Sequence, residues 1–338
     1  MDFYRPLVTL ANRVDYTFYQ RRVWGYHLSN LIFHGAACIL LWLLILRLGF
    51  SAPAALLTAS FFAVHPINVQ DMLMVTGRCG LLGMAFSLLA LVLLLRPAPW
   101  AALAAAGAYV CALLSKESAV MVPVIFLAAV WYLRAPWRPA AWRLGMLAGL
   151  TLLYLALRPA VGHLWPPGVP YSLWVTFITH AFPAVLWSYA KLVLAPIVLY
   201  ANRADPPAAL SGPVLFGAFL LFSVWLAWRA RNNKERWPLF AWVWILAALL
   251  PPTVVMVAKS LMHDHWAYAA LPGFLLPVAL GLAKMFADPR PAWRRAAKGG
   301  AAVLLLFWGG LAHFQVRVRN TDQAFFAWSA RFAALEKK

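Results

Sequence analysis

The sequence predicts an all-α, polytopic integral membrane protein with about ten or eleven transmembrane helices. Of its 338 residues, 64% are hydrophobic and only 12% are charged, whereas soluble domains are about half apolar and a quarter charged. Several apolar runs reach the roughly 20-residue length that spans a bilayer. The formal net charge of +19 comes largely from basic residues beside these runs, so it indicates membrane topology and not a nucleic-acid partner.

The apolar runs divide the chain into successive predicted spans. Ten segments are assigned: 30–47, 53–64, 79–96, 99–115, 118–134, 140–158, 211–229, 237–257, 266–287 and 299–316. An eleventh region, 172–200, is interrupted by Pro183 and Lys191 and is compatible with one kinked span, two short spans or an interfacial helix. We expect one integral membrane domain over 1–338, with an N-terminal segment (1–29) and a short C-terminal tail (318–338) at the outer face.

Five short loops concentrate the basic residues and fall on one side if the spans alternate and the 172–200 region enters and leaves the membrane by the same face. The positive-inside rule makes this side cytoplasmic. The residues are Arg47; Arg96; Arg134, Arg138 and Arg143; Arg229, Arg231, Lys234 and Arg236; and Lys284, Arg290, Arg294, Arg295 and Lys298. The remaining loops then lie outside, and we expect a location in a bacterial cytoplasmic (inner) membrane with the active face outward.

Three polar corners on the predicted outer side carry the candidate functional groups, because ionisable side chains at the edge of a span are costly to keep. They are expected to meet at one membrane face. The candidates are His65, Asp71 and Arg78 in the first corner, Lys116 and Glu117 in the second, and Lys259, Asp264, His265 and Tyr268 in the third.

Each corner also has a purely structural interpretation. Lys116 and Glu117 could form a snorkelling pair at a helix end, and the proline after His65 could make this residue only a helix stop. His263 and His265 have a spacing that can bind a metal, but two loop histidines are weak support for zinc. The aromatic residues of these loops are typical of an interfacial belt.

The sequence lacks the short motifs of several soluble enzyme classes. It contains no G-x-x-x-x-G-K-[ST], no G-x-S-x-G, no H-E-x-x-H and no G-x-G-x-x-G. These absences exclude the ATP-driven and serine-hydrolase interpretations.

A series of short stretches resembles one enzyme family in order and spacing. The stretches are Tyr-Arg-Pro-Leu at 4–7, Gly-Tyr-His-Leu-Ser-Asn at 25–30, His-Pro-Ile-Asn-Val-Gln-Asp at 65–71, Thr-Gly-Arg at 76–78, Leu-Ser-Lys-Glu-Ser at 114–118, Leu-Pro-Pro-Thr at 250–253 and Asp-His-Trp-Ala-Tyr-Ala-Ala-Leu-Pro at 264–272. They resemble the multi-pass O-glycosyltransferases of the GT-C class, which include transmembrane O-mannosyltransferases with tetratricopeptide repeats and short bacterial pilin-type enzymes. The resemblance implies a GT-C-like fold and transfer of a sugar from a polyprenyl-phosphate donor to a hydroxyl of a protein or glycan acceptor.

The sequence departs from this family at three places. Family members usually have one more span before the Tyr-Arg-Pro-Leu stretch, followed by an outer loop whose acidic pair supplies the base, whereas this sequence begins at Met1. The tetratricopeptide repeats do not follow within the 338 residues. Where the family often has an acidic residue after the Gly-Arg pair, this sequence has Cys79 and Gly80.

The implied reaction needs cations for the donor phosphate and a carboxylate that takes a proton from the acceptor hydroxyl. Asp71 is the first candidate for this base and Glu117 the second. If a divalent cation assists, Asp71 and Asp264 are the expected oxygen ligands; no other cofactor is expected. Donor phosphate or substrate binding is expected of His65, Arg78, Lys116, Lys259, Asp264, His265 and Tyr268.

Two other functions remain as alternatives at this point. A catalytically degenerate GT-C-like accessory or scaffold protein would share the fold without the chemistry. A secondary transporter would have charges or broken helices near the bilayer midplane and internal symmetry, and the sequence shows neither. The expected partners of an enzyme are a polyprenyl-phosphate-linked sugar, membrane lipid and a pilin-like or other exported protein.

Overall fold

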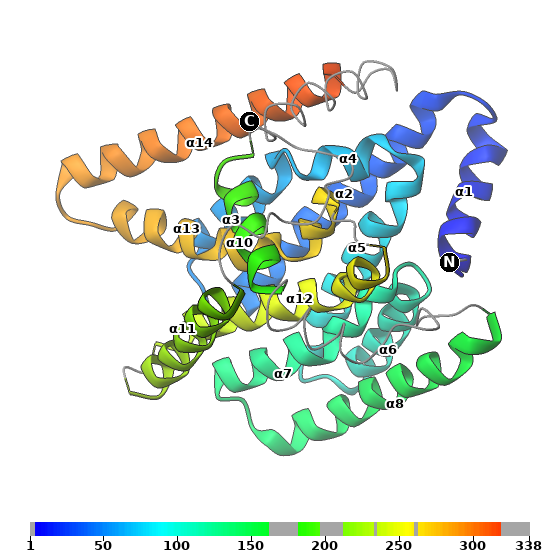
Figure 1. Cartoon of the computed structure of the whole chain (residues 1–338), viewed down its shortest axis with the longest axis horizontal. Coiled ribbons are helices and arrows are strands. Elements are labelled where there is room, and N and C mark those ends of the chain that lie inside the picture. The colour runs from blue at the N-terminus through cyan, green and yellow to red at the C-terminus, as the bar shows by residue number, and fades with distance from the viewer. Residues whose placement is uncertain (1–3, 162–181, 197–211, 233–234, 260–262, 319–338) are drawn as a thin grey trace.

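The computed structural model describes residues 4–161, 182–196, 212–232, 235–259 and 263–318, and within these ranges all regular structure is helical (Figure 1). The all-α prediction is therefore confirmed. The helices are α1 (Pro6–Tyr19), α2 (Val23–Arg47), α3 (Ala52–Val64), α4 (Asn68–Leu73), α5 (Arg78–Leu94), α6 (Pro99–Leu113), α7 (Val122–Leu133), α8 (Trp137–Val161), α10 (Phe182–Leu194), α11 (Gly212–Asn232), α12 (Trp237–Lys259), α13 (Leu271–Phe286) and α14 (Pro291–Val318), with short 3₁₀ helices η1 (Val75–Gly77), η2 (Glu117–Met121) and η4 (Asp264–Ala269).

Every one of the ten predicted apolar segments coincides with a helix. Four helical segments are long and apolar enough to cross a membrane by length and composition: Val23–Arg47, Val75–Leu94, Trp137–Arg158 and Pro291–Val318. Further apolar helical segments among the described residues, such as Ala52–Val64, Pro99–Leu113 and Leu271–Phe286, have only 10–17 residues, so the total of ten or eleven spans stays a prediction. Of the region 172–200, the described part contains α10; the C-terminal tail, 319–338, lies outside the described residues.

Proline and glycine set several of the helix boundaries. Pro53, Pro99, Pro123 and Pro272 stand at the first or second position of α3, α6, α7 and α13, where the missing N–H would have no helical partner. Gly49 follows α2 with a φ of 81°, in the left-handed region that suits glycine. The chain can therefore reverse within four residues and start α3.

Helix α5 lies at the centre of the molecule. Nearly all of its side chains are buried, and it packs against α2 and α6, as expected of a helix that is apolar around its whole circumference. In contrast, α8 and α14 expose apolar side chains such as Leu152, Val303 and Leu306. A soluble protein rarely exposes such faces, whereas lipid accommodates them.

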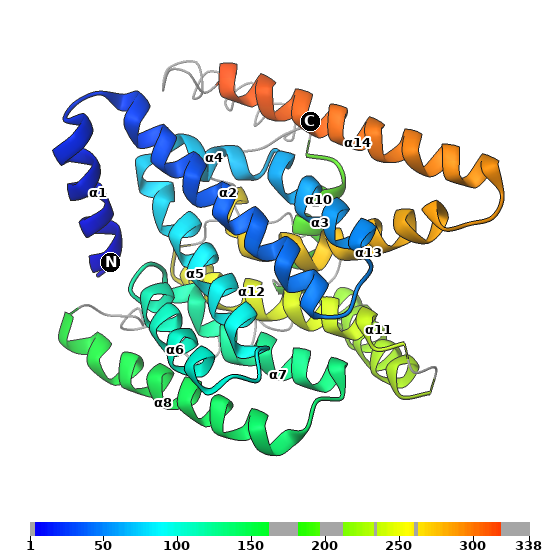
Figure 2. The same ribbon diagram turned by 180° about the vertical axis from the view of Figure 1, so that it is seen from behind.

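One end of the molecule, called the basic end below, carries the turns with the basic residues, and the other end carries the polar corners; Figure 2 locates both ends. The turns between α2 and α3, α7 and α8, and α13 and α14 lie in its right-hand half, while α1, α4 and the final turns of α8 and α14 lie in its left-hand half. At the basic end, Arg143 donates to the carbonyl of Leu94 and Arg236 donates to that of Trp131 at 2.7 Å. Cations are favoured at such helix C-termini.

The three predicted polar corners meet at the opposite end. Helix α4 contacts η4, and both η2 and η4 contact α5 and α12. Helix α4 and η4, which are more than 190 residues apart in the sequence, thus border one site together with the N-terminal half of α5.

The N-terminal segment 1–29 contains a helix that the sequence reading did not predict. Helix α1 packs against α2 and α5, and its one acidic residue, Asp15, is buried. The segment is therefore a structural part of this end of the molecule.

Candidate active site

Three glycines of η1 and α5 let charged groups approach the helix backbone. A Cβ at Gly77 would collide with the backbone of Asp71. A Cβ at Gly80 would stand 2.7 Å from Asp71 Oδ2 and 3.3 Å from Lys116 Nζ, and one at Gly83 would stand 2.9 Å from Lys116 Cβ. The carboxylate and the ammonium therefore lie beside the same point of α5, in space that any larger residue would fill.

Asp71 is a buried acid of this site. Its side chain is 1% exposed, and its Oδ2 accepts no hydrogen bond within the described part of the chain. Burial raises the pKa of Asp71 to about 7, although the positive charges of Lys116 and Arg5 oppose this rise. A carboxyl group with a pKa near neutrality can exchange a proton during a reaction.

Glu117 is engaged by two arginines. Arg5 Nη2 donates to Glu117 Oε2 at 2.8 Å, and Arg158 Nη2 donates to Oε1 at 2.9 Å. Arg158 also donates to the carbonyl of Tyr4 at 2.8 Å, and Arg5 to Cys79 Sγ at 3.2 Å. These bonds join the start of α1, η2, the end of α8 and α5. Since both oxygens of Glu117 are committed to guanidinium groups, the geometry favours Asp71 over Glu117 as the base.

Arg78 lies next to this site, but its donors are directed away from it. Nη2 forms an ion pair with Asp15 at 2.5 Å and donates to the carbonyl of Tyr26 at 3.1 Å. Nε donates to Asn30 Oδ1 at 2.9 Å and Nη1 to Asn12 Oδ1 at 2.8 Å. All three nitrogens are therefore bound within the protein, and the side chain is fully buried. This arrangement favours a role in holding α1 and α2 onto α5 over the expected contact with donor phosphate.

His65 also makes internal contacts. Its Nε2 donates to the carbonyl of Val193 at 3.0 Å, while Nδ1 accepts from the backbone N–H of Ile67 at 3.3 Å, so these bonds assign a neutral tautomer. Burial lowers the pKa of His65 to about 4, and the ring packs against Trp308. His65 directly follows α3 and connects it to α10 and α14, which favours the structural alternative over substrate binding.

The third corner contacts α4 through η4. Tyr268 and Asp264 are buried in η4, and the Tyr268 hydroxyl hydrogen-bonds to His34 Nδ1 at 2.9 Å. His265 lies against the rings of His263 and Trp266. Lys259 is the last residue of α12, and its side chain lies outside the described part of the structure.

A metal site at this corner receives no additional support from the described residues. Among them, no three His, Cys, Asp or Glu side chains gather into a group that could hold an ion. Asp71 and Asp264 come from contacting elements, so a divalent cation between them stays an expectation.

Arg5 and Arg158 as partners of Glu117, and Gly80 as the space beside Asp71, were not predicted from the sequence. One signal was present: the chain has only ten acidic residues against 29 Lys and Arg, and a buried acid requires a cationic or hydrogen-bonding partner. This signal indicates that buried acids have partners but does not identify them.

Comparison with known proteins relates one part of the chain to glycosyltransferases. The chain is 36% identical over 87 residues to protein O-mannosyl-transferase TMTC3 of Mus musculus, and the match covers 26% of this chain and 9% of that protein. It is 32% identical over 128 residues to protein O-mannosyl-transferase tmtc2 of Xenopus laevis, covering 35% and 15%, and 32% identical over 99 residues to protein O-mannosyl-transferase F38B6.6 of Caenorhabditis elegans, covering 27% and 14%. No protein-family model and no solved structure matches the chain.

These matches support the class of membrane O-glycosyltransferases in outline. The aligned part spans at most 15% of the length of these three relatives. The chain is accordingly a multi-pass, all-α membrane protein with a distant, partial similarity to protein O-mannosyl-transferases.

Proposed function

We propose that this protein is a membrane glycosyltransferase that moves a sugar from a polyprenyl-phosphate donor to a hydroxyl of a protein acceptor at the outer face of the membrane. The observation that carries the proposal is the pair formed by the buried Asp71 carboxylate and the Lys116 ammonium beside Gly80. A base for the acceptor and a cation for the leaving group are the two parts that this transfer needs.

In the proposed step, the acceptor oxygen attacks the anomeric carbon of the donor sugar and the bond from that carbon to the phosphate oxygen breaks. The bonding electron pair leaves with the polyprenyl phosphate, and Lys116 stabilises the negative charge that develops there. Asp71 takes the proton of the acceptor hydroxyl and later releases it to water. Arg5 and Arg158 hold Glu117, and thereby the η2 segment that follows Lys116, in place.

The relatives are named as O-mannosyl-transferases, which makes mannose the first sugar to test. The acceptor is expected to be an exported protein with a Ser or Thr hydroxyl, and a glycan hydroxyl is the second choice. Location in the bacterial inner membrane belongs to the same proposal, supported by the basic turns at the opposite end of the molecule from Asp71.

A Lys116→Ala variant tests this assignment. We expect its kcat/KM for polyprenyl-phosphate mannose to fall about 10- to 100-fold, because a charge-assisted contact contributes about 1.5–3 kcal/mol. Lys116→Arg should retain more activity because it keeps the charge. The measurement is transfer of labelled mannose to a Ser/Thr peptide by protein in liposomes.

Lys284→Ala is the matched control, since Lys284 is exposed near the end of α13 at the basic end and should transfer at the wild-type rate. Equal rates for the Lys116 and Lys284 variants would exclude Lys116 from the donor site. If the wild-type protein transfers neither mannose nor another polyprenyl-phosphate sugar, the accessory or scaffold alternative replaces the enzyme.

A further inference from the structure

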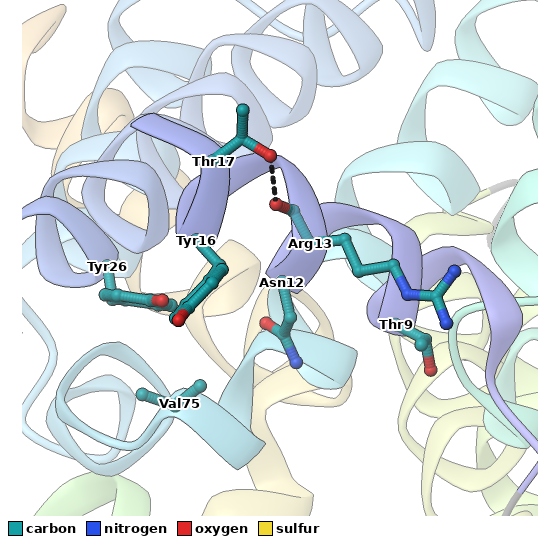
Figure 3. Close-up of a pocket in the computed structure, with 7 residues that line it drawn as sticks. All are labelled: Thr9, Asn12, Arg13, Tyr16, Thr17, Tyr26 and Val75. Atoms are coloured by element: carbon teal, nitrogen blue, oxygen red, sulfur yellow. Dashed lines mark hydrogen bonds between the residues drawn. The ribbon is translucent and has the colours of Figure 1, made fainter. Parts of the chain in front are cut away.

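A cavity of about 570 Å³ lies between α1, the first turn of α2 and η1 (Figure 3). It opens to the surface and faces the same end of the molecule as Asp71. The residues that line it are Thr9, Asn12, Arg13, Tyr16, Thr17, Tyr26 and Val75. Five of these seven lie on one face of α1, so this face of α1 forms one wall.

The lining combines hydrogen-bonding groups with a single formal charge. It contains two threonine hydroxyls, one amide, two tyrosine rings and the Arg13 guanidinium. No carboxylate of the described ranges pairs with Arg13, and Asp15, the one acid of α1, is buried against Arg78. The cavity is therefore cationic and suits an occupant that carries negative charge as well as polar groups.

The cavity and the proposed reaction site share a wall. Val75, the first residue of η1, lines the cavity, and Gly77, the last residue of η1, lies against the backbone of Asp71. Asn12 lines the cavity and accepts a hydrogen bond from Arg78 Nη1. The Arg78 network thus fixes one wall before any ligand binds, which reduces the ordering cost of binding.

We propose that this cavity holds an acidic segment of the acceptor polypeptide beside the Ser or Thr that receives the sugar. The inference rests on the proposed function, because it takes the acceptor to be a protein. Lys116 supplies the cation for the donor phosphate, so the Arg13 cation serves a different anion. A neutral sugar would leave Arg13 without a counter-charge, whereas Asp or Glu of a peptide supplies one, and the hydroxyl and amide groups suit a peptide backbone.

Charge reversal at Arg13 provides the test. Fluorescence anisotropy measures the binding of two labelled Thr-containing peptides, one with Glu and one with Lys flanking the Thr, to the protein in phosphatidylcholine nanodiscs without donor. The wild-type protein should bind the Glu peptide at least tenfold more tightly than the Lys peptide. Arg13→Glu should invert this order. Arg21→Glu, a charge change at an exposed residue near α1 that does not line the cavity, should preserve it.

Two results would overturn the inference. One is an equal effect of Arg13→Glu and Arg21→Glu, which would indicate only the general positive field of this surface. The other is an Arg13→Glu variant that changes the KM for the donor and leaves peptide binding unaltered.

The failure of this inference is distinguishable from failure of the proposed function. Peptide binding is measured without donor and therefore without transfer. Loss of transfer in Asp71→Asn together with unaltered peptide binding in Arg13→Glu would reject the peptide site alone. Inverted peptide preference together with normal transfer by Asp71→Asn would reject the base assignment alone.

Discussion

An Asp71→Asn variant is expected to transfer sugar about 10²- to 10⁴-fold more slowly than the wild-type protein, which is the usual contribution of a general base. Asn keeps the size of the side chain but cannot accept the proton of the acceptor hydroxyl. In the wild-type protein, transfer should rise with pH through about 7, where the buried carboxyl loses its proton. The variant should lack this rise, as initial rates between pH 5 and 9 will show.

A carboxylate supplied from α5 should restore part of this activity. The Cβ of a residue at position 80 would stand 2.7 Å from the present place of Asp71 Oδ2. The double variant Asp71→Ala with Gly80→Asp should therefore transfer faster than Asp71→Ala alone, while Asp71→Ala with Gly80→Asn, its uncharged control, should not. Wild-type rates in Asp71→Asn would remove Asp71 from the mechanism.

The same carboxyl group should make the stability of the protein depend on pH. Its pKa is about 7 in the folded protein and 3.8 as a reference, so the folded state keeps a proton that the unfolded chain releases between these values. The wild-type protein should thus lose stability relative to Asp71→Asn as pH rises from about 4 to 7, by at most about 4 kcal/mol. Thermal unfolding of both proteins in detergent measures the difference, and parallel pH curves would contradict it.

The second large effect is expected at Arg78. Arg78→Ala removes the partner of the buried Asp15 and three further hydrogen bonds of the guanidinium, and breaking a buried ion pair costs about 3–5 kcal/mol. Because these contacts join α1 to α2 and α5, amide hydrogen exchange should accelerate across residues 6–19 first. Arg78→Lys should be intermediate, since it keeps the charge but not the branched geometry.

A double-mutant cycle separates this structural role from donor binding. Arg78→Met with Asp15→Leu should be less destabilised than the sum of the two single variants, because neither charge is left buried alone. If Arg78→Ala keeps wild-type exchange and thermal stability but raises the KM for the donor, Arg78 contacts the phosphate as the sequence predicted and the structural assignment is wrong.

The sequence was sufficient for the fold class and for the meeting of the polar corners. Apolar run length identifies helices such as α5 and α12, and alternation of spans with basic loops puts 65–78, 115–118 and 259–268 at one end. Helix α1 was missed although Leu10, Val14 and Phe18 recur every four residues. Its polar and aromatic composition indicated only a segment at the outer face.

The residues of the candidate site were predicted less completely than the fold, for a physical reason. Asp71 and Lys116 were identified because charge at a membrane edge needs an explanation. Arg78 and His65 carry the same signal, but their partners come from Asp15 and Val193, which only tertiary contacts reveal. A sequence pattern shows that a polar group is costly to bury, whereas the structure shows whether the protein itself or a ligand compensates that cost.

Side chains at positions 71 and 80 compete for the same space, so only one of the two positions can carry a carboxylate there. A Cβ at position 80 would stand 2.7 Å from Asp71 Oδ2, so a chain with acids at both positions would place two like charges in the same small space. An acid reaches that point from α4 in this protein, and an acid at position 80 would reach it from α5. The proposed base is therefore defined by its location in space, which either α4 or α5 can supply.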